Sequence, residues 1–557
     1  MDYSSIQRGY SLDNTFSWFV PEKWGRHDMK FGARYSLTTN HNPIWSNMNG
    51  TYQFRGQGDI KFDPANPRSY PERLNIRVLG PSEYKMKMHV GEFFAQDKWQ
   101  MKPGLTLSAG IRYDLEIFPY EQDPGNPLFR GQSRQYPIDR NNIAPRLGLV
   151  WNPDGESKSV IRAGYGLFYD RTLLGTVDNF LTDLKYASSF VANFPQAGAD
   201  TGPRNGRFPT DPTLNTTDVR QLTPAVRAYI NSIYPPGSTV RNTAGVTWDT
   251  PNRTQPYFHQ VSAGYEREII RGLSVSADYI HMAGRDMFFN PNLNIATGLD
   301  TVRDGQNRVF ADPFGILNPS LSAGEAAFNT TVRLLTTEYG YNNYDALNLS
   351  VEKRYANNYS LRFGYSLSES RGIAAGQGDT PQLQVGTDLN LDEYDAPSST
   401  SRRHNANMSG RLEIPKVTGL TLSGTVRMMT GELYTIQDDT LDLDMNRINF
   451  QPLPAGTYNP DPRAGEHVMR DVEYEGGRNG AVGPSFVQLD MRIGYRACLG
   501  GRRTLDIFGE VFNVTDRANF TNPSGNRRVI ADFLRLNGLV GGTGFPRQGQ
   551  IGLRLGF

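Results

Sequence analysis

Residues 105–117 read LTLSAGIRYDLEI, and no position breaks their alternation of apolar residues with polar residues or glycine. A period of two residues is typical of a β-strand whose two faces meet different surroundings. The same alternation recurs in residues 487–496 and 273–279, whereas no segment shows helical periodicity of comparable quality. We therefore expect an all-β protein.

About fifteen strands of this kind can be placed along the chain, with ends uncertain by a few residues. They are expected near residues 10–20, 27–38, 86–100, 104–117, 142–151, 158–170, 257–268, 272–284, 343–354, 358–370, 404–414, 420–434, 486–496, 502–514 and 547–557. Short turns such as Lys102-Pro103-Gly104 alternate with connections as long as 171–256. Short periplasmic turns and long extracellular loops are typical of an antiparallel outer-membrane β-barrel.

Composition excludes several other classes of protein. The 557 residues include 58 Lys+Arg and 57 Asp+Glu, so the net charge of +1 gives no basic excess for binding nucleic acid. A single cysteine, Cys498, allows neither an internal disulfide nor a multi-thiolate metal site. The mean hydropathy is −0.53, and no run approaches the ~18 apolar residues of a membrane helix.

The apolar face of these strands could point inward, as in a soluble barrel or sandwich, or outward into lipid. A closed barrel of some fifteen strands encloses a lumen too wide for single side chains to fill. A β-propeller divides into blades and repeats every ~40–50 residues, and the connections in this chain are too uneven for that repeat. We therefore expect a transmembrane barrel whose apolar face contacts outer-membrane lipid.

The last strand ends the chain on an aromatic residue. Its apolar positions are Ile551, Leu553, Leu555 and Phe557. A terminal aromatic on an alternating strand resembles the assembly signal of bacterial outer-membrane proteins, which implies the outer-membrane assembly machinery as a partner. The alternative, a soluble edge strand, would expose an apolar edge that is prone to aggregation.

The direction of the strands predicts that part of the barrel lies outside residues 1–557. If the long loops are extracellular, segments 10–20 and 547–557 both run toward the periplasm, and two such strands cannot pair antiparallel. An odd number of further strands is therefore expected before residue 1. Residues 1–24 also lack the charged region, apolar core and cleavage site of a signal peptide.

Several segments resemble TonB-dependent outer-membrane receptors, in particular their Oar-like branch. The resemblance rests on EFFAQDKW (92–99) with LTLSAGIRYD (105–114), NIAPRLGLVW (142–151) with IRAGYGLFYD (161–170), NYDALNLSVEKR (343–354), RHN (403–405) and FNVTDR (512–517). It implies a barrel of about 22 strands closed by an N-terminal plug, which a TonB box couples to the TonB–ExbB–ExbD complex. Residues 1–557 are then a partial receptor barrel without plug, TonB box or signal peptide.

Charges of both signs occupy the inward positions of the expected strands and would line a wet lumen. They are Arg112, Asp114, Glu116, Arg427, Asp490, Arg492, Asp506, Glu510 and Arg554. Charges of both signs predict rows of salt bridges that face a plug. They are less typical of a selective ion filter. No residue set identifies a ligand, and the connection 171–256 is the candidate for ligand binding because it is the longest and mixes aromatic residues with arginine.

Four carboxylates, Asp438, Asp439, Asp442 and Asp444, could hold Ca²⁺ through hard oxygen ligands. The glycine and the closing Glu of the EF-hand pattern are missing, which favours a solvated extracellular loop. The seven histidines form no HxxxH or HxH pair, and no GxSxG nucleophile elbow occurs. We expect no catalytic residue, no bound metal, no cofactor and no enzymatic activity.

The leading hypothesis is TonB-dependent transport, by uptake or export, of a large ligand such as an oligosaccharide, a peptide, a chelate or a protein. The alternatives are a passive porin-like channel and a surface adhesion or assembly protein that displays long loops. All three place the protein in the bacterial outer membrane. A plug and a TonB box upstream of residue 1 would distinguish the first from the other two.

Overall fold

The computed structural model describes residues 6–43, 51–53, 73–79, 83–119, 136–155, 158–174, 188–193, 241–243, 246–250, 253–289, 332–373, 394–438, 440, 452–463, 465–501, 503–541 and 544–557. Almost all of the regular structure in these segments is β-strand. None of the helices in these segments is long and apolar enough to cross a membrane.

Fifteen strands form one curved antiparallel sheet, in which each strand pairs with the next one in the series. They are β1 (Ile6–Val20), β2 (Arg26–Pro43), β5 (Glu83–Lys102), β6 (Leu105–Ile117), β7 (Ile143–Trp151), β8 (Ser159–Tyr169), β12 (Tyr257–Ile270), β13 (Leu273–Phe289), β14 (Val332–Ala356), β15 (Tyr359–Gly372), β17 (His404–Glu413), β18 (Leu420–Met429), β23 (Phe486–Gly500), β24 (Arg503–Phe512) and β25 (Gln548–Gly556). Each matches a strand predicted from the sequence.

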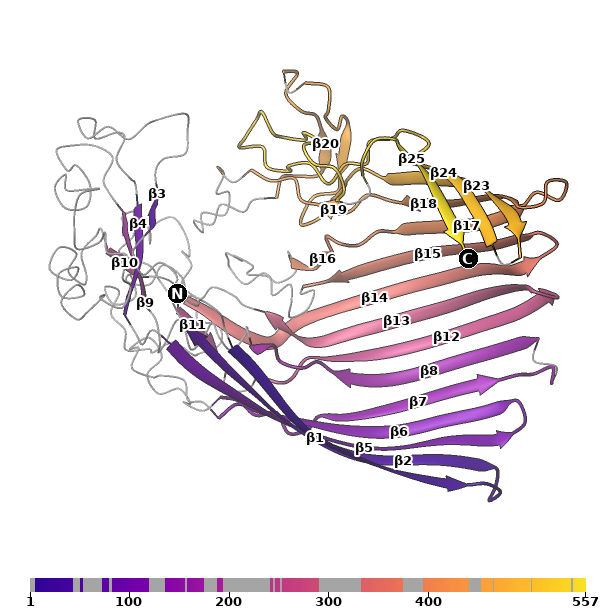
Figure 1. Cartoon of the computed structure of the whole chain (residues 1–557). Coiled ribbons are helices and arrows are strands. Elements are labelled where there is room, and N and C mark those ends of the chain that lie inside the picture. The colour runs from indigo at the N-terminus through magenta and orange to yellow at the C-terminus, as the bar shows by residue number, and fades with distance from the viewer. Residues whose placement is uncertain are drawn as a thin grey trace.

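Figure 1 shows this sheet wrapped into a deep trough, with the short turns at one end and the long connections at the other. The two edges are β1 and β25, and they do not pair with each other in the described part of the chain. An antiparallel series of fifteen strands begins and ends in the same direction, so these two edges could not join in antiparallel register. The predicted all-β, antiparallel architecture is confirmed.

The short turns take backbone conformations that their residues favour. Asn357 and Asn358, between β14 and β15, both have positive φ, 55° and 67°. Two such residues make a type I′ turn, whose twist matches that of the strands it joins. Gly104 and Gly272 supply φ of 82° and 77° in two other hairpins.

One predicted strand is too long. Segment 420–434 was expected to be continuous, but β18 ends at Met429, and Leu433–Tyr434 (β19) pairs in a different sheet with Ala481–Val482 (β22). The chain leaves the main sheet at Gly431, where a Cβ atom would lie 1.9 Å from the carbonyl oxygen of Gly483. Close approach of two backbones, which only glycine permits, therefore ends the strand.

The long connections contain structure that the alternation pattern did not predict. β3 (Thr51–Gln53), β4 (Arg73–Leu79), β9 (Ser188–Asn193) and β10 (Arg241–Thr243) form one small sheet; β19, β22, β21 (Val472–Tyr474) and β20 (Gly456–Tyr458) form another. β11 (Val246–Asp249) pairs parallel with the start of β14, and β16 (Ala396–Pro397) pairs with β15. These strands are too short for a periodic pattern to reveal.

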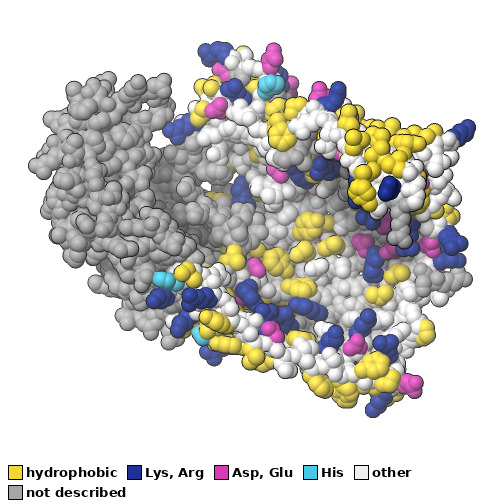
Figure 2. All heavy atoms as spheres, viewed as in Figure 1, with side chains coloured by type: hydrophobic (Ala, Val, Ile, Leu, Met, Phe, Trp, Pro, Cys, Tyr) yellow, Lys and Arg dark blue, Asp and Glu magenta, His cyan; other side chains and the backbone are white. Residues whose placement is uncertain are grey.

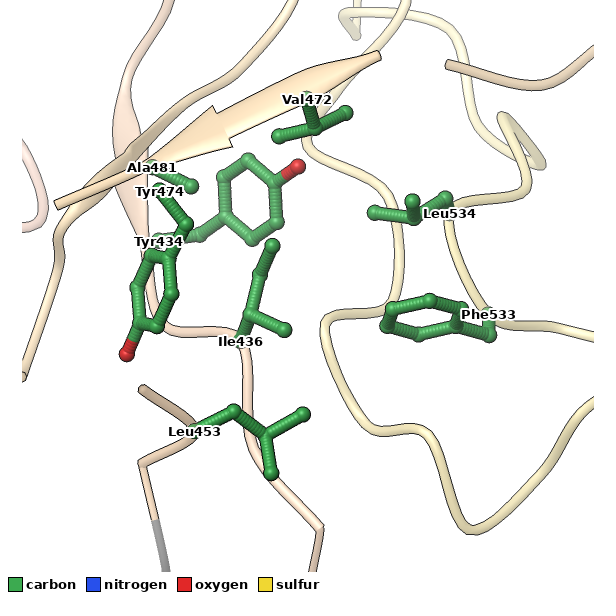
Figure 3. Packing of buried hydrophobic residues seen from close by; sticks show 8 residues of the cluster. All are labelled: Tyr434, Ile436, Leu453, Val472, Tyr474, Ala481, Phe533 and Leu534. Carbon is green, nitrogen blue, oxygen red and sulfur yellow. The ribbon is translucent and has the colours of Figure 1, made fainter. Parts of the chain in front are cut away.

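A hydrophobic core lies among the C-terminal loops, outside the main sheet (Figure 3). It consists of Tyr434, Ile436, Leu453, Val472, Tyr474, Ala481, Phe533 and Leu534. The cluster joins the connection before β23 to the connection before β25. Burial in it raises the pKa of the Tyr474 hydroxyl to about 12. These two loops therefore form one packed unit above the strands.

Replacing Ile436 with Ala is expected to lower the free energy of unfolding of this loop unit by about 2–5 kcal/mol, because the side chain is fully buried and the change leaves a cavity. Faster limited proteolysis within residues 452–485 and 515–541 would show the effect. Val529→Ala, at an exposed position of the same unit, is the control and should not change the cleavage rate. Equal rates for both variants would contradict a packed core.

Candidate functional site

The register of the sheet separates two faces. Opposed pairs such as Phe16–Phe31 and Phe93–Tyr113 place large apolar side chains on the outer, convex face. Phe16, Phe31 and Phe93 are exposed, as is Leu553 on β25, at 71%. Figure 2 looks into the hollow of the trough, where dark blue and magenta side chains gather, while yellow ones cover β23–β25. The outer face is therefore apolar and the inner face charged.

Three of the predicted inward residues meet in one network on β5 and β6. Arg112 donates to Asp114 at 2.8 Å and lies 2.8 Å from Glu92. Arg171 contacts the same Glu92 carboxylate at 2.6 Å, and Glu116 accepts from the backbone of Thr172 at 3.1 Å. The network ties the first residues after β8 to the wall of the sheet.

The other predicted residues lie on the same face, on β18, β23, β24 and β25. Arg492 lies 3.0 Å from Glu510 and 3.8 Å from the centre of the Phe508 ring. Asp506 is paired with Arg496 and stands opposite Arg554 in the register. Arg427 stands opposite Gln488, whose amide donates to Asp490 at 2.8 Å. Their assignment to a transport lumen stays a prediction.

Part of this inner face is hollowed. A groove of about 730 Å³ runs across β14, β15, β17, β18, β23 and β24. Arg362, Arg411 and Arg492 lie along it together with Glu352, Asp490 and Glu510. Because positive and negative side chains both line the groove, it is better suited to contact a polar protein surface than to bind one small ion.

A buried ion pair at the base of the loops was not anticipated from the sequence. Arg253 lies 2.8 Å from Asp249, and their side chains are 5% and 0% exposed. Arg253 also stacks over the rings of Tyr136 and Phe288, at 5.0 and 5.2 Å. We call Tyr136, Asp249, Arg253 and Phe288 the loop-base cluster.

Burial and charge pairing oppose each other in the loop-base cluster. Burial raises the pKa of Asp249 above its ordinary value, although the adjacent Arg253 guanidinium acts in the other direction. Burial alone would lower the pKa of Arg253, but the Asp249 carboxylate beside it raises that pKa above its usual range. Each charge is therefore stabilised in a buried place mainly by the other.

Hydrogen bonds hold the end of the longest connection next to this cluster. The backbone of Gln255 donates to Asp139 at 2.8 Å, and its side chain accepts from Asn142 at 2.8 Å. Thr254 donates to Asp286 at 2.7 Å. The chain entering β12 is thus fixed to the segment before β7 and to the last residues of β13.

Two predicted features fall partly or wholly outside the described residues. Most of the connection 171–256, the candidate for ligand binding, lies outside them. So do Asp439, Asp442 and Asp444, whereas Asp438 accepts from Thr440 at 2.5 Å and lies 3.3 Å from Arg527. The Thr440 hydroxyl, more than Arg527, lowers the pKa of Asp438. The described residues contain no group of three or more His, Cys, Asp or Glu side chains that could hold a metal ion.

The proposed assembly signal lies on the outer face of the last strand. Ile551, Leu553 and Leu555 alternate outward along β25, where Leu553 stands opposite Ile507 and Leu555 opposite Leu505. Phe557 follows the end of the strand and is 88% exposed. Recognition of these residues by the assembly machinery stays a prediction.

Comparison with known proteins supports this architecture. The outer membrane beta barrel domain family matches residues 2–550. The TonB-dependent transporter Oar of Myxococcus xanthus is 22% identical over 282 residues, which cover 50% of this chain and 23% of that protein.

Solved structures share the fold at low sequence identity. The outer membrane transporter YddB of Escherichia coli aligns with a TM-score of 0.54 and 12% identity, over 99% of this chain and 54% of that one. A variant of the ferric enterobactin receptor of Pseudomonas aeruginosa gives a TM-score of 0.51 and 10% identity, again over 99% and 54%. The chain thus spans about half of these structures and about a quarter of the curated relative. It belongs to the outer membrane beta barrel domain family and is a protein of the bacterial outer membrane.

Proposed function

We propose that residues 1–557 are part of the barrel of a TonB-dependent transporter that moves a large ligand across the outer membrane. The observation that carries the proposal is the charged inner face, in which Arg112, Glu92 and Arg171 form one network. Similarity to the transporter Oar and to the fold of YddB supports it. No residue set selects among an oligosaccharide, a peptide, a chelate and a protein as ligand.

The complete barrel would contain further strands between β25 and β1. Both edges run in the same direction, so antiparallel closure needs an odd number of additional strands. A barrel of about 22 strands, as in outer-membrane transporters, would supply seven. Barrels of this size hold a plug in the lumen, and the mixed charges of the inner face, among them Arg427, Asp490 and Arg554, are suited to contact one.

Such a transporter needs the TonB–ExbB–ExbD complex as its source of energy. We expect the complete protein to bind the purified periplasmic domain of TonB and to show no steady ion conductance in planar bilayers. The opposite pair of results, steady conductance without TonB binding, would overturn the proposal and favour a passive channel. A protein with neither property would favour a surface adhesion or assembly role.

The membrane barrel itself has a separate test. The complete protein is expected to migrate faster in SDS gels before boiling than after, because a closed barrel of hydrogen-bonded strands resists the detergent until it is heated. The comparison needs only one purified sample, split and loaded in two halves. Equal mobility of both halves would contradict a closed barrel.

The loops are the candidates for ligand recognition. Deleting residues 205–244 within the longest connection should leave the barrel heat-modifiable, because no strand of the main sheet is removed, while binding of the transported ligand is lost. The measurement is gel mobility together with binding of culture-medium components identified by mass spectrometry. Unchanged binding would move recognition to the connections 285–342 or 435–485.

A further inference from the structure

The hairpin of β7 and β8 carries the segments NIAPRLGLVW (142–151) and IRAGYGLFYD (161–170), to which the proposed transport assigns no role. Strands β6, β7 and β8 lie side by side in the wall of the trough (Figure 1). In the half of the hairpin nearer the loops, the positions on the inner face are Ala144, Arg146 and Gly148 on β7 and Gly164, Gly166 and Phe168 on β8. Arg146 is the one charged residue among them.

Arg146 has no side chain beside it in either neighbouring strand. It stands opposite Gly110 on β6 and opposite Gly166 on β8. In the next inward row toward the turn, Gly148 stands opposite Gly164. We call Gly110, Gly148, Gly164 and Gly166 the glycine frame. Glycine inside a strand often marks a place where a ligand or another backbone approaches closely, so the wall around Arg146 leaves room for a second chain.

An aromatic ring supports the guanidinium of Arg146. The guanidinium carbon lies 4.5 Å from the centre of the Phe168 ring. The ring in turn rests on Gly166, where a Cβ atom would come within 2.5 Å of Phe168 Cε2. Pairing between β7 and β8 ends at Arg146, and the next residue toward the loops, Pro145, has no N–H to extend it. Stacking occupies a face of the guanidinium and leaves the N–H groups on its edge for another partner.

Arg146 differs from the inward arginines of the two adjacent strands. Arg112 on β6 and Arg162 on β8 each pair with two carboxylates, at 2.8–3.0 Å. The side chain of Arg146 is exposed and makes neither an ion pair nor a hydrogen bond with any residue that the structure describes. On a wall where neighbouring charges are paired, this guanidinium is free to bind an acidic group in the lumen.

We propose that Arg146 binds a carboxylate side chain of the plug and that the glycine frame admits the backbone that carries it. This inference rests on the proposed function, because it requires a plug in the lumen. A guanidinium binds a carboxylate through two parallel N–H···O bonds, which fix orientation as well as position. The occupant is a protein segment instead of a small free anion, since the glycines clear the wall on both sides of Arg146.

The partner is identified by chemical coupling. In the complete protein, Arg146→Lys keeps the positive charge and supplies an amine, which a carbodiimide joins as an amide to a carboxylate in direct contact. We expect peptide mass spectrometry to find this amine coupled to an Asp or Glu of the plug. Coupling to a carboxylate of the wall, such as Asp114, or no coupling would overturn the inference.

Arg162→Lys is the matched control for the coupling. Its carboxylate neighbours, Glu266 and Asp278, lie 3.0 Å from Arg162 in the structure, so the introduced amine should couple to one of them. Coupling in the control without coupling at position 146 would overturn this inference alone. A complete protein without a plug segment, which conducts ions steadily, would contradict the proposed function and the inference with it.

Gly148→Leu tests the glycine frame. A Cβ atom at position 148 would meet its nearest neighbour, in Ser108, only at 3.7 Å, so the wall itself accepts a side chain. Combined with Arg146→Lys, it should lower the coupling yield about tenfold, because the added side chain overlaps the bound backbone. Gly9→Leu, on the inner face of β1 where nothing lies within 4 Å of the Cβ position, should leave the yield unchanged. Equal yields in both variants would contradict the frame.

Release of the plug by urea gives an independent readout. In planar bilayers, Arg146→Gln should open the lumen to ions at a lower urea concentration than the unchanged protein, because the plug has lost one anchor. The difference should shrink at acidic pH, where the partner carboxylate is protonated and the unchanged protein loses the same ion pair. An unchanged urea concentration, or a difference that persists at acidic pH, would overturn the inference. Heat-modifiable migration of every variant confirms that its barrel is folded.

Discussion

Replacing Phe557 with Asp is expected to remove most of the protein from the outer membrane. The side chain is 88% exposed and follows the last strand, β25, at the end of the barrel that carries the short turns. A charged residue near the membrane interface costs only about 0–1 kcal/mol in a folded barrel. The substitution should therefore change the stability of the folded barrel very little. A large decrease in the amount of assembled protein would indicate that the assembly machinery recognises the terminal residue.

The measurement is the amount of heat-modifiable protein in outer-membrane fractions, at equal synthesis. Trp24→Asp is a matched control, because Trp24 is an aromatic residue, 83% exposed, in the turn after β1 at the same end of the barrel. It should assemble normally. Normal levels of the Phe557 variant would show that Ile551, Leu553, Leu555 and Phe557 face lipid without serving as an assembly signal.

The strands could be predicted from the sequence because their signal is local. In β6, successive residues point alternately to the lipid and to the charged interior. The polarity of each residue therefore indicates the face on which its side chain lies. The inward placement of Arg112, Asp114 and Glu116 follows from that alternation alone. The alternation of apolar and polar residues does not indicate that the chain leaves the main sheet at Gly431. That change depends on the close approach of Gly483, which lies 52 residues further along the sequence.

The partners of those charges required the register of neighbouring strands. Glu92 stands opposite Asp114 only because β5 and β6 pair as they do, and Arg171 reaches Glu92 from a loop. The loop-base cluster gave no signal in the sequence, because Asp249 and Arg253 are four residues apart in a segment without helical periodicity. Their burial depends on Tyr136, in the connection before β7, and on Phe288, at the end of β13.

The two ion-pair systems differ in what they can contribute. The network around Glu92 lies on the inner face; its arginine side chains, Arg112 and Arg171, are 32% and 47% exposed, whereas Glu92 is only 10% exposed. Two partly exposed arginines therefore compensate one nearly buried carboxylate. In the pair of Arg253 with Asp249 both side chains are buried, and the pair holds the base of the loops.

Arg253→Met is expected to destabilise the loop base by about 3–5 kcal/mol, because Asp249 would remain buried without a compensating charge. Hydrogen exchange of residues 136–142 and 246–255 measures the effect. Asp249→Leu combined with Arg253→Met should recover much of the protection, since apolar groups can replace a buried ion pair. Arg463→Met breaks a pair whose arginine side chain is 90% exposed and should have little effect.

The loss in Arg253→Met should depend on pH in a defined direction. Burial already raises the pKa of Asp249, and removal of Arg253 takes away an influence that lowers it. The folded variant then binds a proton more readily than the unfolded chain, so its stability rises as pH falls. We expect the destabilisation to shrink at acidic pH, where Asp249 is buried as a neutral acid. A loss that grows as pH falls, or one that the double variant does not relieve, would show that Arg253 acts through its stacking on Tyr136 and Phe288 instead of through its charge.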